Sequence, residues 1–331
     1  MDGVTPAEPT ADVPASPMGR FEIPLAALAS AIAFSTLLFV PLLGALGVPL
    51  AGVPLVRLTH RRGVVAGLIG CGLTAALVFG VAWAAAGPSD ALAAAFVAAG
   101  VTLLPTASVG FLRAAADPSR CYLGLCVAGA AFIGAAFAAA AGGPGPGVGA
   151  QVAAGFDRLI PAAVESYARS GADAEMLARM RAVMETTREF VRQYLWGVLG
   201  ALWVLAAAIS FYGGARAARP VPTAEAARYE TLRLPAAAAG LFVASGAAFG
   251  VLSGVGRRVA GNLLLPLLTL FFVAGLSIIC HFFRRWFRVR LLRAGLYALA
   301  AYFPVNVGVA LLGLFDWYVD FRRRGEGVRQ S

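Results

Sequence analysis

Apolar residues gather in long runs that short polar stretches separate. A helix needs about 20 consecutive apolar residues to cross the hydrocarbon core of a bilayer. Eight runs approach or exceed that length, and they cover residues 24–56, 64–86, 91–112, 121–141, 194–212, 234–254, 262–282 and 291–315. The pattern therefore predicts an all-α protein, a polytopic transmembrane helix bundle of about eight spans.

The first run is longer than one span requires. Glycine and proline interrupt its second half at Gly47, Pro49, Gly52 and Pro54. Proline removes a backbone donor and breaks a helix, and irregular backbone is tolerated at membrane depth only where protein or a water-filled cavity covers it. We expect a spanning helix followed by a short broken or re-entrant segment.

One long polar insertion lies between the fourth and fifth runs. Apolar residues recur at helical spacing from Val152 to Tyr167 and again from Met176 to Val191, with a break at Ser170 and Gly171. This periodicity predicts an amphipathic helical hairpin. The hairpin could cap the bundle, act as a gate over a cavity, or provide a docking site for a partner.

The predicted organisation has five parts. A disordered tail over residues 1–20 is indicated by proline and acidic residues. Spans 1–4 occupy residues 21–142, and residues 143–192 hold a Gly/Pro linker and the hairpin. Spans 5–8 occupy residues 193–321, and residues 322–331 form a basic tail.

Composition supports a membrane protein and limits the chemistry. Hydrophobic residues make up 60% and charged residues 13% of the 331 residues, whereas soluble domains carry about 25% charged residues. The net charge of +10 comes from 27 basic residues that are all arginine and cluster near the ends of apolar runs. That placement suits membrane orientation rather than nucleic acid. The absence of lysine excludes Schiff-base lysine chemistry and the P-loop lysine.

Counting the arginines of the short loops gives an orientation. Fourteen fall on one side of the predicted spans and seven on the other, and both termini are expected on the arginine-poor side. The arginine-rich side is expected to be cytoplasmic. An error of one in the span count would move the C-terminal arginines across.

Four cysteines and two histidines offer little for a metal site. The cysteines show no C-x-x-C spacing, and His60 and His281 lie in different parts of the chain. We predict no metal and no cofactor. No Asp, Glu or Arg interrupts the runs, which argues against a proton pump or a cation-coupled carrier.

Neutral polar groups within the apolar runs are the candidate ligand-binding residues. Thr102 and Thr106 flank Pro105, Asn262 precedes Pro266, and Asn306 follows Pro304; we name Thr102, Thr106, Asn262 and Asn306 as candidates. Proline frees a carbonyl that a nearby Thr or Asn can satisfy. These groups are therefore either structural kinks or the lining of a pocket for a small, neutral, polar ligand.

Two further patterns concern helix packing and the C-terminus. Gly246, Gly250 and Gly254 repeat every fourth residue, which predicts close packing with a helix of this chain or of a second copy. Near the end of the last run lie Gly313, Asp316, Asp320 and Arg322. Asp316 and Asp320 share a helical face, and we expect an ion-pair latch with Arg257 or Arg258 rather than a catalytic dyad, because no activated nucleophile accompanies them.

The C-terminal third carries a resemblance to a known family. Gly261-Asn262, Gly275-Leu276, the basic loop after His281, the stretch from Leu312 to Asp316, and Asp320-Phe321-Arg322 resemble the YybS-like family of predicted bacterial membrane proteins. The resemblance implies a multi-pass protein of the bacterial inner membrane. The family is also distantly similar in helix arrangement to the S components of energy-coupling-factor vitamin transporters, which implies small-molecule binding or uptake.

Two functional hypotheses follow, and neither is enzymatic. The first is a transporter-like protein that binds a small neutral ligand. The second is a scaffolding protein of the cell envelope that uses the hairpin and the Gly246 face to hold other membrane proteins. The expected partners are the lipid bilayer, such proteins and such a ligand, and not nucleic acid.

Overall fold

The computed structural model describes residues 21–39, 47–113, 117–141, 148–219, 221–222, 224, 227–286, 289–302, 304–319 and 321. Within these residues every regular element is helical, so the all-α prediction is confirmed. The elements are α1 (Glu22–Phe39), α3 (Val53–Arg62), α4 (Val64–Ala86), α5 (Pro88–Arg113), α6 (Pro118–Ala141), α7 (Val148–Arg169), α8 (Ala174–Ala208), the π-helix η2 (Ile209–Gly213), α9 (Gly214–Ala218), the 3-10 helix η3 (Tyr229–Thr231), α11 (Ala236–Val251), α12 (Gly254–Trp286), α13 (Arg290–Ala301) and α14 (Val305–Val319).

Five stretches of helix are long and apolar enough to cross a membrane. They are Val64–Ala85, Ala91–Leu112, Pro118–Ala135, Ala174–Ala218 and Gly254–Phe283, while α1, α11 and α14 contain shorter apolar helices. All eight coincide with predicted apolar runs. The predicted tails at 1–20 and 322–331 and the glycine- and proline-rich residues 142–147 lie outside the described residues.

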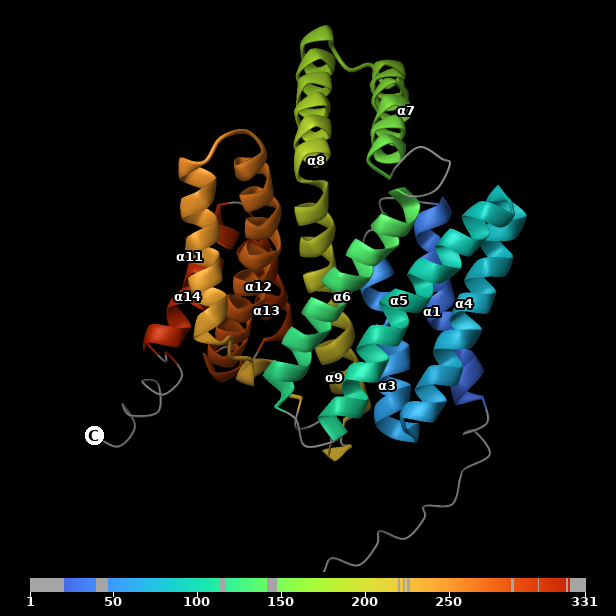
Figure 1. Cartoon of the computed structure of the whole chain (residues 1–331), viewed down its shortest axis with the longest axis vertical. Coiled ribbons are helices and arrows are strands. Elements are labelled where there is room, and N and C mark those ends of the chain that lie inside the picture. The colour runs from blue at the N-terminus through green and yellow to red at the C-terminus, as the bar shows by residue number, and fades with distance from the viewer. Residues whose placement is uncertain are drawn as a thin grey trace, which may run out of the picture.

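The helices form two groups with α6 and α8 between them (Figure 1). On one side α1, α3, α4 and α5 pack together, and on the other α12 packs against α11 and α14. α8 contacts both α6 and α12, and α6 contacts α5. α8 therefore connects the two groups, and the buried Trp203 and Phe211 near its end belong to the main hydrophobic core.

α8 is also too long to lie wholly within a bilayer. Helical conformation runs from Ala174 to Ala218, which is 45 residues. At a rise of about 1.5 Å per residue, this stretch is more than twice as long as a bilayer core of about 30 Å is thick. Its first part, residues 174–193, projects from the bundle beside α7 (Figure 1). We refer to α7 together with residues 174–193 as the α7–α8 arm.

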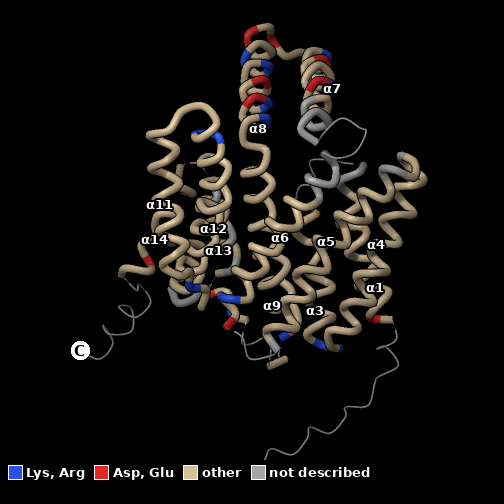
Figure 2. Tube along the Cα trace, viewed as in Figure 1, with Lys and Arg blue, Asp and Glu red and all other residues tan. Residues whose placement is uncertain are grey.

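Local contacts explain the shape of the arm. Gly171 adopts a φ of 85° in the turn after α7, a conformation that glycine adopts without steric cost. The Asp173 carboxylate then caps α8 by accepting a hydrogen bond of 2.7 Å from the Met176 backbone N–H. Arg188 lies 2.6 Å from Asp157 of α7. Figure 2 shows acidic and basic residues interspersed along the arm.

The first and last predicted spans are corrected by the structure. The run at 24–56 contains α1 and then α3, which are two separate helices rather than one span with an irregular end. The run at 291–315 is divided into α13 and α14, with Tyr302 and Pro304 between them. Proline disfavours helical conformation in the residue before it, so α13 ends at 12 residues, which is too short to span alone.

The predicted orientation of the termini is also wrong. Glu22, at the start of α1, accepts a hydrogen bond of 2.7 Å from Arg62, at the end of α3. At the other end of the described chain, Asp316 lies in a pocket with Arg233. Both chain ends therefore lie near the arginine-rich end of the bundle. The error arose because the first run was counted as a single crossing, although α3 returns the chain to its starting side.

The corrected arrangement makes the charge asymmetry larger. Figure 2 shows basic residues at the α3 end of the bundle, where Arg57, Arg61 and Arg62 lie. The turn between α11 and α12, at the opposite end, is followed by Arg257 and Arg258. Because arginine-rich loops are retained in the cytoplasm, we expect the α3 end to be cytoplasmic.

Cysteine labelling tests this orientation across α11. Thr231, before α11, and Ser253, after it, are both exposed. In cells that express the protein in a bacterial inner membrane, Ser253→Cys should react with an impermeant maleimide in intact cells, and Thr231→Cys only after permeabilisation. The unmodified chain provides the background from the four native cysteines. The reverse pattern would contradict the orientation.

Candidate functional site

Thr102 and Thr106 lie in a buried polar contact between α3, α4 and α5. Both side chains are 0% exposed. Thr102 Oγ1 donates to the Ala98 carbonyl oxygen at 2.8 Å, and Cys71 Sγ of α4 lies 3.5 Å from Thr106 Oγ1. A Cβ on Gly67 would overlap the side chains of Thr59 and Thr106. The two threonines therefore sit where three helices approach closely.

Asn262 bridges a break in α8. Tyr194 has non-helical angles, φ −118° and ψ 27°, so the helix is kinked there. The Asn262 Oδ1 atom accepts a hydrogen bond of 2.7 Å from the Gly197 N–H, and its Nδ2 donates to the Gln193 carbonyl oxygen at 3.1 Å. In an unbroken helix Gly197 N–H would donate to Gln193 directly. The amide of Asn262 therefore replaces the missing backbone hydrogen bond from the neighbouring helix.

The bridge requires that α8 and α12 approach closely. A Cβ on Gly197 would lie 2.9 Å from the Asn262 Cα and carbonyl oxygen. One turn later, a Cβ on Gly200 would lie 3.2 Å from Pro266. The two glycines give α12 the room that places the Asn262 amide at the break.

Asn306 lies apart from the other candidates, in the first turn of α14. Its backbone N–H donates to the Tyr302 carbonyl oxygen at 3.0 Å, and its buried Oδ1 accepts no hydrogen bond from the described residues. α14 packs against α12, whereas the helix of Thr102 and Thr106 packs against α3, α4 and α6. The structure does not bring the four residues into one pocket, and ligand binding by any of them stays a prediction.

The glycine face predicted in α11 is open within this chain. A Cβ on Gly246 would only touch Leu264 at 4.0 Å, and one on Gly250 or Gly254 would meet nothing within 4 Å. The close packing occurs instead between α12 and α14, where a Cβ on Gly275 would overlap the Val309 carbonyl oxygen and one on Gly313 the Phe271 carbonyl oxygen. Packing of the Gly246 face against a second chain stays a prediction.

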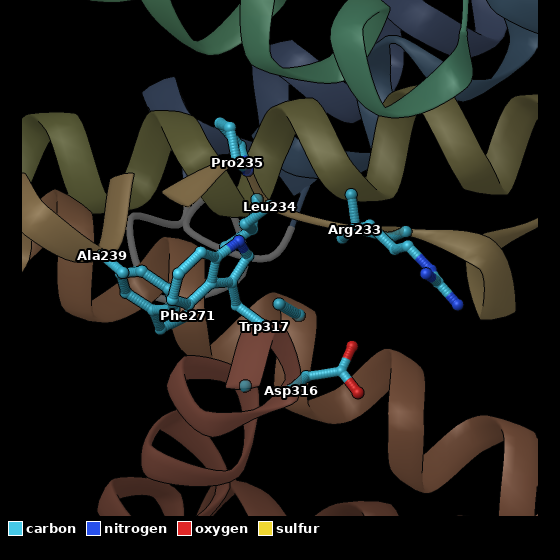
Figure 3. Close-up of a pocket in the computed structure, with 10 residues that line it drawn as sticks. Arg233, Leu234, Pro235, Ala239, Phe271, Asp316 and Trp317 are labelled. Atoms are coloured by element: carbon cyan, nitrogen blue, oxygen red, sulfur yellow. The ribbon is translucent and has the colours of Figure 1, made fainter. Parts of the chain in front are cut away.

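The C-terminal motif forms part of a small pocket, shown in Figure 3. It has a volume of about 100 Å³ and lies between α12, α14 and the loop before α11. Trp317 points from α14 toward Leu234, and Asp316 and Arg233 lie on the same side of the pocket (Figure 3). Asp320 and Arg322 lie outside the described residues.

This placement overturns the expected latch between Asp316 and Arg257 or Arg258. Arg257 instead lies over the Phe249 ring, 4.8 Å from its centroid, at the opposite end of α11. The Arg233 backbone N–H donates to Ser119 Oγ at 3.1 Å, which fixes the loop against the start of α6. Asp316 therefore belongs to the arginine-rich end.

The larger cavity is an apolar groove between α6, α8, α11 and α12, with a volume of about 490 Å³. Trp203 donates from Nε1 to the Leu125 carbonyl oxygen at 3.1 Å and lies against Gly129, where a Cβ would overlap the indole. Trp196 is 45% exposed. The remaining lining residues are Leu123, Cys126, Val127, Ala130, Ile133, Gly134, Gly200, Val204, Ala237, Ala238, Leu241, Asn262, Leu263, Pro266, Leu267 and Leu270.

Sequence reasoning missed this groove, although a signal was present. Trp196, Gly200 and Trp203 follow each other at spacings of four and three, which places an aromatic–small–aromatic pattern on one face of α8. Such a face creates a recess at the glycine. In the part of the chain that the structure describes, no three His, Cys, Asp or Glu side chains are grouped as metal ligands.

Replacement of Asn262 tests the bridge across α8. Asn262→Leu leaves Gly197 N–H and the Gln193 carbonyl group without their partner, which should destabilise the protein by about 1–3 kcal/mol. Thr269→Val is the matched control, since Thr269 donates only to the Leu265 carbonyl group of its own helix, at 3.0 Å. Thermal unfolding in detergent measures both. Equal melting temperatures for the parent and Asn262→Leu would rule out the bridge as a stabilising contact.

Comparison with known proteins gives a family and nothing finer. Among curated proteins and among solved structures, no match to the chain was found. The likeness to S components therefore has no support beyond the sequence resemblance. A family model described as "Predicted membrane protein (DUF2232)" matches residues 27–317, which include every candidate ligand-binding residue and the whole groove. This protein belongs to the DUF2232 family of predicted membrane proteins.

Proposed function

We propose that this protein is a non-enzymatic protein of the bacterial inner membrane that binds a lipophilic small molecule in the groove between α6, α8, α11 and α12. The groove supports this proposal best. Its volume of about 490 Å³ falls within the range of roughly 300–1,000 Å³ that is typical of small-molecule sites.

The lining indicates the chemical class of the ligand. Apart from Asn262 and Cys126, the side chains that line the groove are aliphatic or aromatic or belong to glycine or proline. The Asn262 amide is already engaged, because its Oδ1 accepts from Gly197 and its Nδ2 donates to Gln193 and Arg258. A polar ligand would find few free partners here. The proposal therefore changes from a neutral polar ligand to an apolar one.

The groove is accessible from the side of the bundle. Val127 is 70% exposed, Leu241 46% and Leu263 40%, although all three line it. In a bilayer, these apolar surfaces face lipid rather than water. A ligand dissolved in the membrane could therefore enter without crossing a polar barrier, which suits binding or uptake of a membrane-soluble compound.

The S-component resemblance is compatible with this proposal but does not carry it. Likeness of helix arrangement does not transfer function. A transport-like role would also require a partner or a second conformation. The proposal is therefore limited to binding, with uptake as its extension.

A second candidate function is a scaffold that binds partners through the α7–α8 arm. Apolar side chains along the arm are exposed: Leu159 is 55%, Val183 65% and Met176 53% exposed. The arm projects beyond the rest of the bundle (Figure 1), where a partner protein could reach it. Exposed apolar groups of this kind are typical of protein–protein contacts.

Filling the groove tests the first candidate. Gly134 lines the groove, and a Cβ there meets nothing within 4 Å, so Gly134→Leu fits the helix and places its side chain in the cavity. Solvent extraction of the purified protein, followed by mass spectrometry, should show an apolar compound that the variant retains about tenfold less. Gly124→Leu is the matched control, because Gly124 is on the same helix with equal space and lies outside the groove.

Two outcomes would contradict the binding role. One is a parent protein that carries no compound beyond bulk lipid and shows no shift in melting temperature across a panel of lipophilic vitamins, quinones and isoprenoids. The other is equal retention by the parent, Gly134→Leu and Gly124→Leu, which would place the compound elsewhere.

Polar substitution of the arm tests the scaffold candidate. Leu159→Gln combined with Val183→Gln should abolish co-purification of partner membrane proteins, since it removes exposed apolar contacts without altering the capping of α8. Ala162→Gln combined with Ala178→Gln is the control, because these alanines are exposed on the same helices. Identical partners for the parent and both variants would reject the arm as a docking site.

A further inference from the structure

A second cavity, separate from the groove, lies at the arginine-rich end. It is a cleft of about 420 Å³ between α1, α3 and α9, and it shares no lining residue with the groove. Its walls are Glu22, Leu25, Ala26, Ala29, Val53, Pro54, Arg57, Leu58, Arg61 and Ala217. Polar and apolar groups occupy different parts of it, which is the arrangement that an amphiphile requires.

Helical periodicity explains how the cleft forms. On α3, Val53, Arg57 and Arg61 are spaced by four residues and share one face. The opposite face of α3 is buried, with Thr59 0% and His60 1% exposed. Because the core fixes that face, the two arginines are directed toward α1 and the cleft rather than inward.

The charge at the mouth of the cleft is positive. Arg57 and Arg61 line it, and Arg62 follows at the end of α3. Glu22 is the acidic residue among the lining side chains, lying 2.7 Å from Arg62 Nε and 3.7 Å from Arg61. The three arginines therefore exceed the one carboxylate by two charges. No ion pair is recorded for Arg57 among the described residues, and it is exposed.

Beyond the arginines the cleft becomes apolar. Leu25, Ala26 and Ala29 share one face of α1 and extend from Glu22 over about 10 Å along the helix. The adjoining lipid-facing surface continues with Leu28, 46% exposed, and Ile32, 59% exposed. An acyl chain whose head group lay at the arginines could therefore follow α1 toward the middle of the bilayer.

We propose that the cleft between α1, α3 and α9 binds an anionic phospholipid, with its phosphate group at Arg57 and Arg61 and an acyl chain along Leu25 and Ala29. Arginine pairs with phosphate through a rigid fork of donors. Basic pockets between helices on the cytoplasmic side are suited to anionic lipid head groups. This site does not depend on the proposed function of the groove, because the two cavities are built from different helices.

Titration with phosphatidylglycerol tests the site. The full chain is purified in an uncharged detergent, and bound lipid is measured by native mass spectrometry against phosphatidylcholine. The parent should prefer phosphatidylglycerol, and Arg57→Gln and Arg61→Gln should each weaken that binding about fivefold. Arg57→Lys should retain most of it. Arg120→Gln is the matched control, an exposed arginine at the start of α6 that does not line the cleft.

Two further variants separate this site from general surface charge and from a site for free phosphate. Glu22→Gln removes the competing carboxylate and should strengthen phosphatidylglycerol binding, the opposite sign to Arg57→Gln. Ala29→Trp fills the apolar part and should weaken it while all arginines remain. Inorganic phosphate should compete poorly, because it gains nothing from Leu25 and Ala29.

Each remaining outcome overturns the proposal. Equal binding of phosphatidylglycerol and phosphatidylcholine would show that no anionic site exists. Equal loss in Arg120→Gln and Arg57→Gln would show an effect of net charge alone. Full competition by inorganic phosphate, with no effect of Ala29→Trp, would show an anion site that does not recognise lipid.

Discussion

The bridge that Asn262 makes across the break in α8 is the contact on which much of this structure depends. Within a membrane, each backbone group that is freed from a helix must find a partner inside the protein, because no water is available to replace it. At Tyr194 the hydrogen-bond ladder of α8 is interrupted, and the Asn262 amide supplies both a donor and an acceptor. The kink therefore occurs without an unsatisfied group, and it separates the polar arm from the apolar remainder of α8.

The same contact sets the position of the groove. Because Asn262 fixes α12 against α8 at Gly197, and Pro266 follows against Gly200, the two helices are close along one side. On the other side, Trp203 extends from α8 to Gly129 of α6 and fixes that pair. α6 and α11 are thus held apart by α8, and the space between them is the groove. An amide that looks like a candidate ligand-binding group is, in this geometry, part of the frame around an apolar cavity.

Much of the architecture could be predicted from sequence, for a physical reason. A charge-free run of about 20 residues has few stable alternatives to a spanning helix, so α4, α5, α6 and α12 were predicted close to their observed bounds. Length alone does not fix direction, which is why α1 and α3 were counted as one crossing. Pro304 indicated the break in the last run, but the run remained apolar across it and concealed the separation of α13 from α14.

The candidate sites were less accessible to sequence because they depend on distant partners. Asn262 contacts Gly197, 65 residues away, and no local pattern indicates that pairing. The glycines of α11 show where close approach is sterically allowed, but the close approach within the chain occurs at Gly275 and Gly313. A small-residue face states that packing is possible and does not identify the partner. The groove and the cleft likewise appear only once three or four helices have been placed together.

An experimental structure in lipid nanodiscs tests the central claim most directly, namely that the groove between α6, α8, α11 and α12 is a binding site for an apolar compound. The account predicts continuous density, elongated and without polar contacts, lying along Trp203 and Gly134 and bounded by an intact Asn262 bridge. Direct contact between α6 and α11 that closes the groove, with no density between them, would contradict it.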